Sequence, residues 1–164
     1  LTECEPHLEN WGGHPMAVGV KLSEQNLEAF SKAFNQAMAL FYPDGIPEPE
    51  LDIACWIDFE DLGDELMEEL SLLEPYGQMN PEPILGLKRV MLKEEARTFA
   101  KVHKQFILMQ KHQPEKTVEG IAWNFESMPE ANELVDIAVR LEWNTWNNVK
   151  TSRVILIDWK KSIL

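Results

Sequence analysis

Cysteine is scarce in this sequence, and its scarcity excludes two common ways of holding a small protein together. Cys4 and Cys55 are the only cysteines among 164 residues, and neither belongs to a CxxC motif or to a Cys/His pair at ligand spacing. Two such thiols provide neither a disulfide framework nor a zinc site. We therefore expect a reducing, cytoplasmic environment, with Cys55 as a small buried hydrophobic residue.

Long hydrophobic runs are also missing. Apolar runs such as 106–109 and 154–157 are far too short to span a bilayer. The sequence begins at Leu1 without a charged and apolar leader. These features predict a soluble protein with no membrane partner, cut from a longer chain.

Basic residues are nearly absent from the first half of the chain. Residues 1–74 contain 17 acidic and 2 basic residues, whereas residues 75–164 contain 11 and 13. The net charge of −13 argues against nucleic acid as a partner of the whole chain. Segment 86–114, however, holds seven Lys or Arg and two Glu. This excess is either a phosphate-facing stripe or a set of solvated strand edges, and both readings stay open.

The first 42 residues combine a short motif with an amphipathic pattern. Gly12 and Gly13 free backbone amides that could bind a phosphate oxygen, and the imidazole of His14 follows them. A lone histidine is more often structural, and His14 has no partner at metal-ligand spacing. We expect a short buried strand over 16–20. Apolar residues at three- and four-residue steps predict a helix over 27–41.

A proline-rich stretch over 42–50 predicts the first boundary. Loose alternation predicts a strand over 51–57, and Asp58 is a suitable N-cap for a helix over 59–72. We interpret the acidic face of this helix as solvated rather than metal-binding, because no histidine accompanies its carboxylates.

Three prolines restrict the segment 73–85, which separates the acidic half from a strand-rich half. We interpret it as a rigid connector into a new sheet. The connector is either a structural corner alone or a corner that also presents Tyr76 and Asn80 to a ligand.

The C-terminal half predicts five strands, because it is rich in β-branched and aromatic residues between polar turns. The expected strands are 84–92, 105–110, 118–125, 135–143 and 153–159, with a turn over 144–148. Five strands of this length suggest a small barrel, and the number of strands favours a barrel of the OB type.

Aromatic, amide and basic side chains gather around the last expected turn. Trp143, Asn144 and Trp146, followed by Lys150 and Arg153, supply stacking planes, base-edge hydrogen bonds and phosphate neutralisation. The alternative is that either tryptophan plugs the end of the barrel. No nucleophile constellation can be assembled from the sequence, so no catalytic residue is predicted.

Separated motifs resemble one family. The stretch 11–19 (WGGHPMAVG) with 26–30 (NLEAF) resembles the end of the DHH-associated domain of the RecJ single-strand-specific exonucleases. The stretch 73–83 (LEPYGQMNPEP) resembles the segment that leads into the OB domain of these proteins, with Met79 in place of a usual glycine. Residues 144–146 with 153–158 resemble the closing hairpin of that domain.

The resemblance implies an α+β chain in three parts. Residues 1–42 would be a partial α/β segment from the end of the DHH-associated domain. Residues 43–74 would be a linker, a strand and an acidic helix, and residues 75–164 would be a five-stranded OB-type β-barrel that binds nucleic acid.

The resemblance also implies a function. The family degrades single-stranded DNA from the 5′ end with two divalent metals, typically manganese or magnesium, in an N-terminal DHH domain whose motifs this sequence lacks. The chain would be an inactive fragment of such an enzyme of DNA repair and recombination, and it would grip single-stranded DNA. A single-strand-binding protein or a helicase is a further expected partner.

The resemblance also bears on which residues form the site. Gly12, Gly13 and His14 would contact phosphate at the lip of the active site. The expected DNA contacts of the barrel and its corner are Tyr76, Asn80, Lys88, Arg89, Lys101, Lys104, Trp123, Trp143, Asn144, Trp146, Lys150 and Arg153. We expect at least one of the four aromatic residues to belong to the core. The alternative function is a protein-interaction OB module that does not bind nucleic acid itself.

Overall fold

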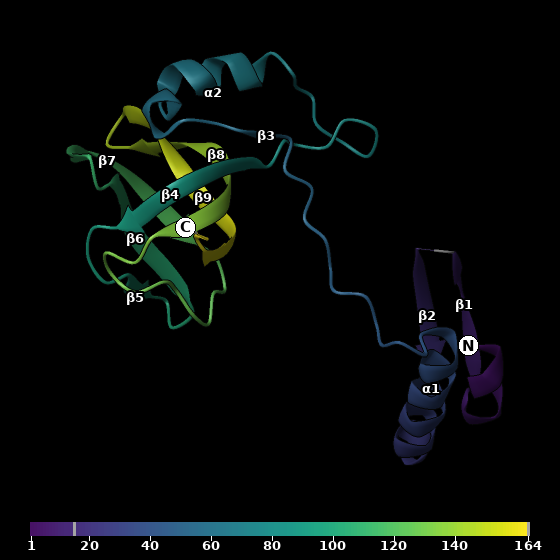
Figure 1. Ribbon diagram of the computed structural model, residues 1–164. Helices are drawn as coiled ribbons and strands as arrows, with labels where there is room; N and C mark the ends of the chain where they lie inside the picture. Colours follow the sequence, from purple (N-terminus) through teal and green to yellow (C-terminus); the bar gives the residue numbers. More distant parts are fainter. Residues whose placement is uncertain (15, 164) are drawn as a thin grey trace. The chain divides into compact units, whose positions relative to one another are not determined.

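The computed structural model describes residues 1–14 and 16–163, which form two compact units, Leu1–Glu50 and Leu51–Leu164 (Figure 1). We call them the N-terminal unit and the sheet unit. Among the described residues, no helix is long and apolar enough to cross a membrane.

The N-terminal unit contains one hairpin and one long helix. After a 3₁₀ helix, η1 (Thr2–His7), strand β1 (Asn10–His14) pairs antiparallel with β2 (Ala17–Lys21). A second 3₁₀ turn, η2 (Glu24–Asn26), precedes α1 (Leu27–Phe41), which confirms the helix predicted there. The strand predicted at 16–20 is present as β2, but the prediction that it is buried is wrong: every residue of β2 is exposed, and it pairs with β1.

The sheet unit is built on seven strands. They are β3 (Cys55–Trp56), β4 (Leu85–Leu92), β5 (Arg97–Phe99), β6 (His103–Gln110), β7 (Gln113–Ala122), β8 (Val135–Trp146) and β9 (Val149–Lys161). Their order is β3-β4-β8-β9-β7-β6-β5, and only the β3–β4 and β7–β9 pairs are parallel. Strand β6 also pairs back to β4 through Met91↔Met109 and Leu92↔Leu108, so five strands form a circuit of pairings.

The five predicted strands are present, with different ends. The separate strand predicted over 51–57 is reduced to the two residues of β3, and β5 lies where no strand was predicted. Strands β8 and β9 run three and four residues further toward each other than predicted, so their turn consists of Asn147 and Asn148 alone. Both residues have positive φ, 49° and 63°, a conformation that asparagine tolerates better than most residues.

The core lies inside the circuit of strands. Alternate residues of β4, β6, β8 and β9 point inward, and Leu87, Leu108, Val139 and Val154 are completely or almost completely buried. Each such side chain contributes about 1.5–3 kcal/mol of transfer free energy on burial.

The helix predicted over 59–72 is divided. A 3₁₀ turn, η3 (Phe59–Asp61), is followed by α2 (Asp64–Ser71), and Leu62 and Gly63 between them adopt extended backbone. The break lets Phe59, Leu62 and Met67 all enter the core. The acidic side chains of α2 stay exposed, as predicted.

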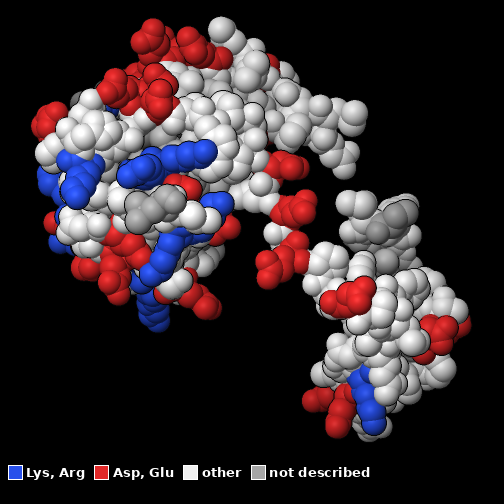
Figure 2. Space-filling view, viewed as in Figure 1, with Lys and Arg blue, Asp and Glu red and all other residues white. Residues whose placement is uncertain are grey.

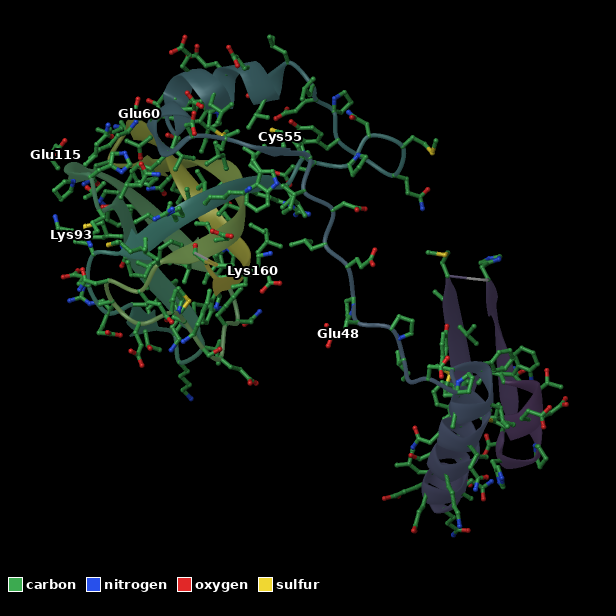
Figure 3. The ribbon with its side chains drawn as sticks, viewed as in Figure 1. Glu48, Cys55, Glu60, Lys93, Glu115 and Lys160 are labelled. Carbon is green, nitrogen blue, oxygen red and sulfur yellow. The ribbon has the colours of Figure 1, made fainter. Side chains whose placement is uncertain are left out.

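Three hydrogen bonds connect this segment to the strands. The backbone N–H of Ser152 donates to Asp64 Oδ1 at 2.9 Å. Glu60 accepts hydrogen bonds from Gln113 and Lys116 of β7 (Figure 3). Cys55, by contrast, is exposed, so the prediction that it is buried is wrong: it lies on a two-residue edge strand (Figure 3).

Candidate nucleic-acid interface

A groove lies beside the β8–β9 hairpin on the outer face of the sheet. We call it the hairpin groove, and its volume is about 540 Å³. Strand alternation produces it, because residues 144 and 146 of β8 face the same side and pair with Thr151 and Val149 of β9. The lining residues are Gln105, Glu119, Asn144, Trp146, Asn147, Val149, Thr151 and Arg153.

The hairpin groove brings together three predicted contacts from the two strands of the β8–β9 hairpin: Asn144, Trp146 and Arg153. Trp146 is 73% exposed, because it is the last residue before the turn and pairs only with Val149. An exposed indole beside an amide and a guanidinium is the kind of surface that stacks and hydrogen-bonds single-stranded bases.

The charge of the groove is mixed. The guanidinium of Arg153 forms an ion pair with Glu142, its partner across the β8–β9 ladder. Glu119 also lines the groove. A phosphate would therefore compete with Glu142 for Arg153, and such exchange makes binding sensitive to salt.

Trp143 and Lys150 lie outside the hairpin groove and contact each other. Trp143 packs against the core, and Lys150 Nζ lies 3.8 Å from the centroid of its ring. This cation–π contact covers one face of the indole. The expectation that one of the four aromatic residues belongs to the core is consistent with this placement.

In the proline-rich connector, residues 73–85, Tyr76 and Asn80 form hydrogen bonds within the protein. The Tyr76 hydroxyl donates to the carbonyl of Leu70 at 2.7 Å, at the C-terminal end of α2. Asn80 Nδ2 donates to the carbonyls of Leu73 and Pro75 at 2.8 and 3.1 Å. Burial, followed by the nearby Glu74 and Glu82 carboxylates, raises the pKa of Tyr76.

Lys88 and Arg89 lie on β4, away from the lining of the groove. Lys88 Nζ lies 4.7 Å from the centroid of the Trp56 ring. Arg89 occupies a β-bulge with φ of 56°, and its backbone N–H donates to Asp136 Oδ1 at 3.1 Å.

The remaining three predicted contacts surround the β5–β6 hairpin. Lys101 lies in its turn with φ of 75°, and Lys104 Nζ donates to Thr98 Oγ1 at 2.9 Å. Trp123 follows β7 and contacts the rings of Phe99 and His103. Figure 2 shows Lys and Arg over the strands of the sheet unit, interspersed with Asp and Glu, and a further group of Asp and Glu over α2.

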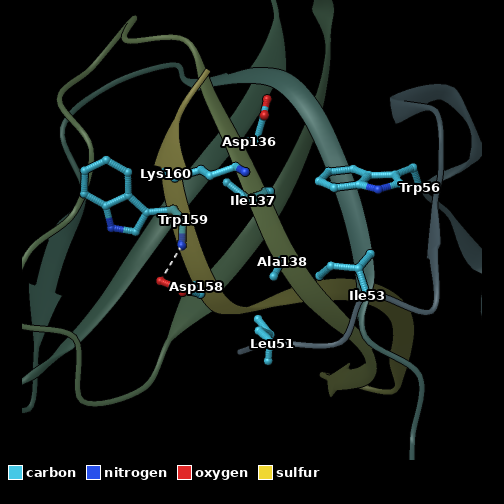
Figure 4. Close-up of a pocket in the computed structure, with 9 residues that line it drawn as sticks. All are labelled: Leu51, Ile53, Trp56, Asp136, Ile137, Ala138, Asp158, Trp159 and Lys160. Carbon is cyan, nitrogen blue, oxygen red and sulfur yellow. Dashed lines mark hydrogen bonds between the residues drawn. The ribbon is translucent and has the colours of Figure 1, made fainter. Parts of the chain in front are cut away.

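A second hollow lies between residues 51–56, which end in β3, and the paired strands β8 and β9 (Figure 4). Its volume is about 160 Å³, and Trp56 and Trp159 stand on opposite sides of a floor that includes Ala138. It contains both carboxylates, Asp136 and Asp158, and the ammonium of Lys160. None of the predicted contact residues lines it.

The glycine motif lies on β1 in the N-terminal unit. Gly12, Gly13 and His14 are all exposed and pair with Gly19, Val18 and Ala17. A Cβ atom on Gly13 would lie 2.2 Å from the Ala17 carbonyl oxygen, whereas one on Gly12 would meet nothing within 4 Å. Close approach of the two strands therefore explains Gly13 without any ligand.

No group of three or more His, Cys, Asp or Glu side chains with a metal-binding arrangement occurs within residues 1–14 and 16–163. Gln105 and Thr151 of the groove, and the ring partners of Trp123, were not predicted from the sequence. Strand alternation could have placed them on the outer face, but the strand pairing that brings them together is not visible in one sequence.

A circuit of five paired strands is typical of OB-type domains. The family model described as RecJ OB domain matches residues 53–158. The chain belongs to this family.

Curated relatives are similar in sequence to nearly the whole chain. The single-stranded-DNA-specific exonuclease RecJ of Thermus thermophilus is 33% identical over 162 residues, which cover 98% of this chain and 22% of the relative. The Bacillus subtilis protein of the same name is 26% identical over 163 residues, covering 96% and 20%. The chain thus spans about a fifth of the length of these relatives.

Solved structures are similar in fold. The crystal structure of Thermus thermophilus RecJ in complex with Mn²⁺ superposes with a TM-score of 0.68 at 27% identity, covering 99% of this chain and 23% of that one. The corresponding Mg²⁺ complex gives a TM-score of 0.63 at 29% identity, covering 99% and 24%.

Proposed function

We propose that this chain is the single-stranded-DNA-binding portion of a RecJ-like 5′-to-3′ exonuclease of DNA repair and recombination. Hydrolysis belongs to a DHH domain outside this chain, and that domain holds Mn²⁺ or Mg²⁺. Residues 1–42 are the end of the DHH-associated domain, and the circuit of β4, β8, β9, β7 and β6 is a closed OB-type barrel. Family membership and the names of the relatives support this proposal.

The observation that carries the proposal is the exposed indole of Trp146 in the hairpin groove. In our account Trp146 stacks on a base, and the amides of Asn144 and Gln105 meet base edges. Arg153 exchanges its ion pair with Glu142 for a phosphate. Stacking on an aromatic side chain contributes about 1–3 kcal/mol per base and tolerates any sequence.

The experiment is fluorescence-anisotropy titration of the chain with a labelled single-stranded oligonucleotide. Trp146→Ala should weaken binding by roughly 5- to 100-fold, which corresponds to the loss of one stacked base. Trp56→Ala is the matched control, since Trp56 is also exposed but lies on β3, outside the groove. Equal affinities of the Trp146 and Trp56 variants would contradict the claim that the hairpin groove binds the single strand.

The exposed acidic face of α2 favours a second candidate, a protein-interaction module with a basic partner. A single-strand-binding protein or a helicase bound elsewhere on the chain also remains compatible with the main proposal. A folded chain that fails to bind any oligonucleotide at low salt would favour the interaction module.

A further inference from the structure

The geometry points to a second base-stacking site, formed by Phe99, His103 and Trp123 at the β5–β6 hairpin. We call these three residues the aromatic platform. The inference rests on the proposed single-strand binding and adds to it a position that stacks a nucleobase apart from Trp146.

The three rings form one mutual contact set. The Trp123 ring centroid lies 4.9 Å from that of His103 and 5.9 Å from that of Phe99, and the Phe99 and His103 centroids are 5.4 Å apart. Both neighbours are nearly perpendicular to the indole, at 79° and 71°. Such edge contacts hold the Trp123 ring in place without laying a parallel ring against its face.

The platform is separate from the hydrophobic core. Among the described residues, the partly buried side chains that pack against the core include Trp143 and Trp159 but neither Phe99 nor Trp123. Trp123 is 43% exposed. A tryptophan that is fixed by its neighbours yet exposed and outside the core is available for stacking.

Backbone hydrogen bonding also fixes the histidine of the platform. The N–H of Asn124, which has φ of 57°, donates to His103 Nδ1 at 3.2 Å. In the neutral ring the proton is therefore on Nε2, which can donate to a base or to a phosphate oxygen.

The charges around the platform match a nucleic-acid strand. Residues 97–105 contain Arg97, Lys101 and Lys104 and no Asp or Glu, although strand alternation puts Lys104 and its partner Thr98 on the side opposite to His103. Arg97 lies opposite Gln105 in the β5–β6 pairing, two residues along from the Phe99–His103 pair and therefore on the same face. Cations beside an aromatic surface suit a strand that carries one phosphate for each base.

The platform and the hairpin groove lie on one face. His103 and Gln105 are two residues apart on β6 and face the same side, and Gln105 lines the groove. The Cα atoms of residues two apart in a strand are separated by about 7 Å. One single strand can therefore contact both sites as it crosses β6 and β7.

The test compares two lengths of labelled oligothymidine, about 4 and about 12 nucleotides, within the range of site sizes of OB domains. For the longer oligonucleotide, Trp123→Ala should weaken binding by roughly 5- to 100-fold, and Trp123→Phe should restore most of the affinity. For the shorter oligonucleotide, the difference in affinity between wild type and Trp123→Ala should be smaller, because this oligonucleotide can bind in the hairpin groove alone. Trp56→Ala, of similar exposure (48%), is the control.

The outcomes separate this inference from the proposed function. If the wild-type chain binds and Trp146→Ala weakens binding while Trp123→Ala binds like wild type, the platform is hairpin packing only and the inference fails. If the wild-type chain does not bind, the proposed function fails and the inference fails with it. Photocrosslinking of a bromouracil oligonucleotide should label Trp123 or residues 97–105 of the unmodified chain; labelling elsewhere alone would contradict the platform.

Discussion

The twelve side chains expected to contact DNA in the sheet unit have different surroundings. Trp146 is open to solvent in the hairpin groove, and Trp123 is exposed but held by two other rings. Trp143, by contrast, lies between the core and an ammonium group. A sequence shows that aromatic and basic residues are near one another, but which of them lie on the outer face depends on strand register.

Tyr76→Phe tests the structural role of the corner. Removing the hydroxyl leaves the Leu70 carbonyl without this donor, which should lower the free energy of unfolding by about 0.5–1.5 kcal/mol in urea titrations. Single-strand affinity should stay unchanged. A lower affinity with unchanged stability would instead assign Tyr76 to the ligand.

The same variant has a pH signature. The pKa of Tyr76 is raised in the folded state above its ordinary value of 10.0. Its contribution is therefore fully present below pH 10 and is lost as the pH rises through the folded-state pKa. The difference in stability between wild type and Tyr76→Phe should shrink above pH 10.

Gly13→Ala and Gly12→Ala form a matched pair within β1. The new Cβ at position 13 would overlap the Ala17 carbonyl and Val18 Cα, which should destabilise the N-terminal unit by about 1–3 kcal/mol. The same change at position 12 has space and should cost less than about 1 kcal/mol. Hydrogen exchange of β1 and β2 amides measures both, and equal protection in the two variants would contradict the strand-approach explanation.

At the scale of elements, the pattern of apolar residues was a good guide for the longer segments. The spacing of apolar residues located α1 at its observed bounds, and the enrichment in β-branched and aromatic residues located β4 to within one residue. It failed at 59–72, because Phe59 and Leu62 fit a helical stripe as well as they fit a 3₁₀ turn that enters the core. The short strands β3 and β5 have too few residues to show a period.

The site was less predictable than the fold. Asn144 and Trp146 were placed in a turn, although they extend β8 as far as Asn147 and Asn148. The motifs named several correct neighbours in the groove, but Gln105 and Thr151 join them only through pairings across strands. Long-range pairing of this kind leaves no local signal in a single sequence.

Phe59→Ala tests how η3 attaches to the sheet. Phe59 is almost completely buried, so the substitution should lower the free energy of unfolding of the sheet unit by about 3–5 kcal/mol. Glu60→Ala is the neighbouring control: its side-chain contact with Gln113 is exposed and should contribute less than about 1 kcal/mol. A small effect of Phe59→Ala in thermal and urea unfolding would mean that the segment is dispensable for the core.

At the scale of the whole chain, the distribution of charge bears on the two candidate functions, single-strand binding and interaction with a protein. The acidic residues concentrate before residue 75, while the strands that carry the groove and the platform contain most of the basic ones. Binding to a single strand releases counterions, and the logarithm of the affinity falls with the logarithm of salt concentration by about 0.7 per neutralised phosphate. Contacts with roughly three or four phosphates would give a slope near −2 to −3.

The most direct measurement is therefore an anisotropy titration of the chain with a labelled single strand and with its duplex, over a series of salt concentrations. Our account predicts preference for the single strand, a negative salt slope of that size, and loss of the preference in Trp146→Ala. Equal binding of single strand and duplex, or no binding at low salt by a chain with a folded circular-dichroism spectrum, would contradict the claim that this domain grips single-stranded DNA.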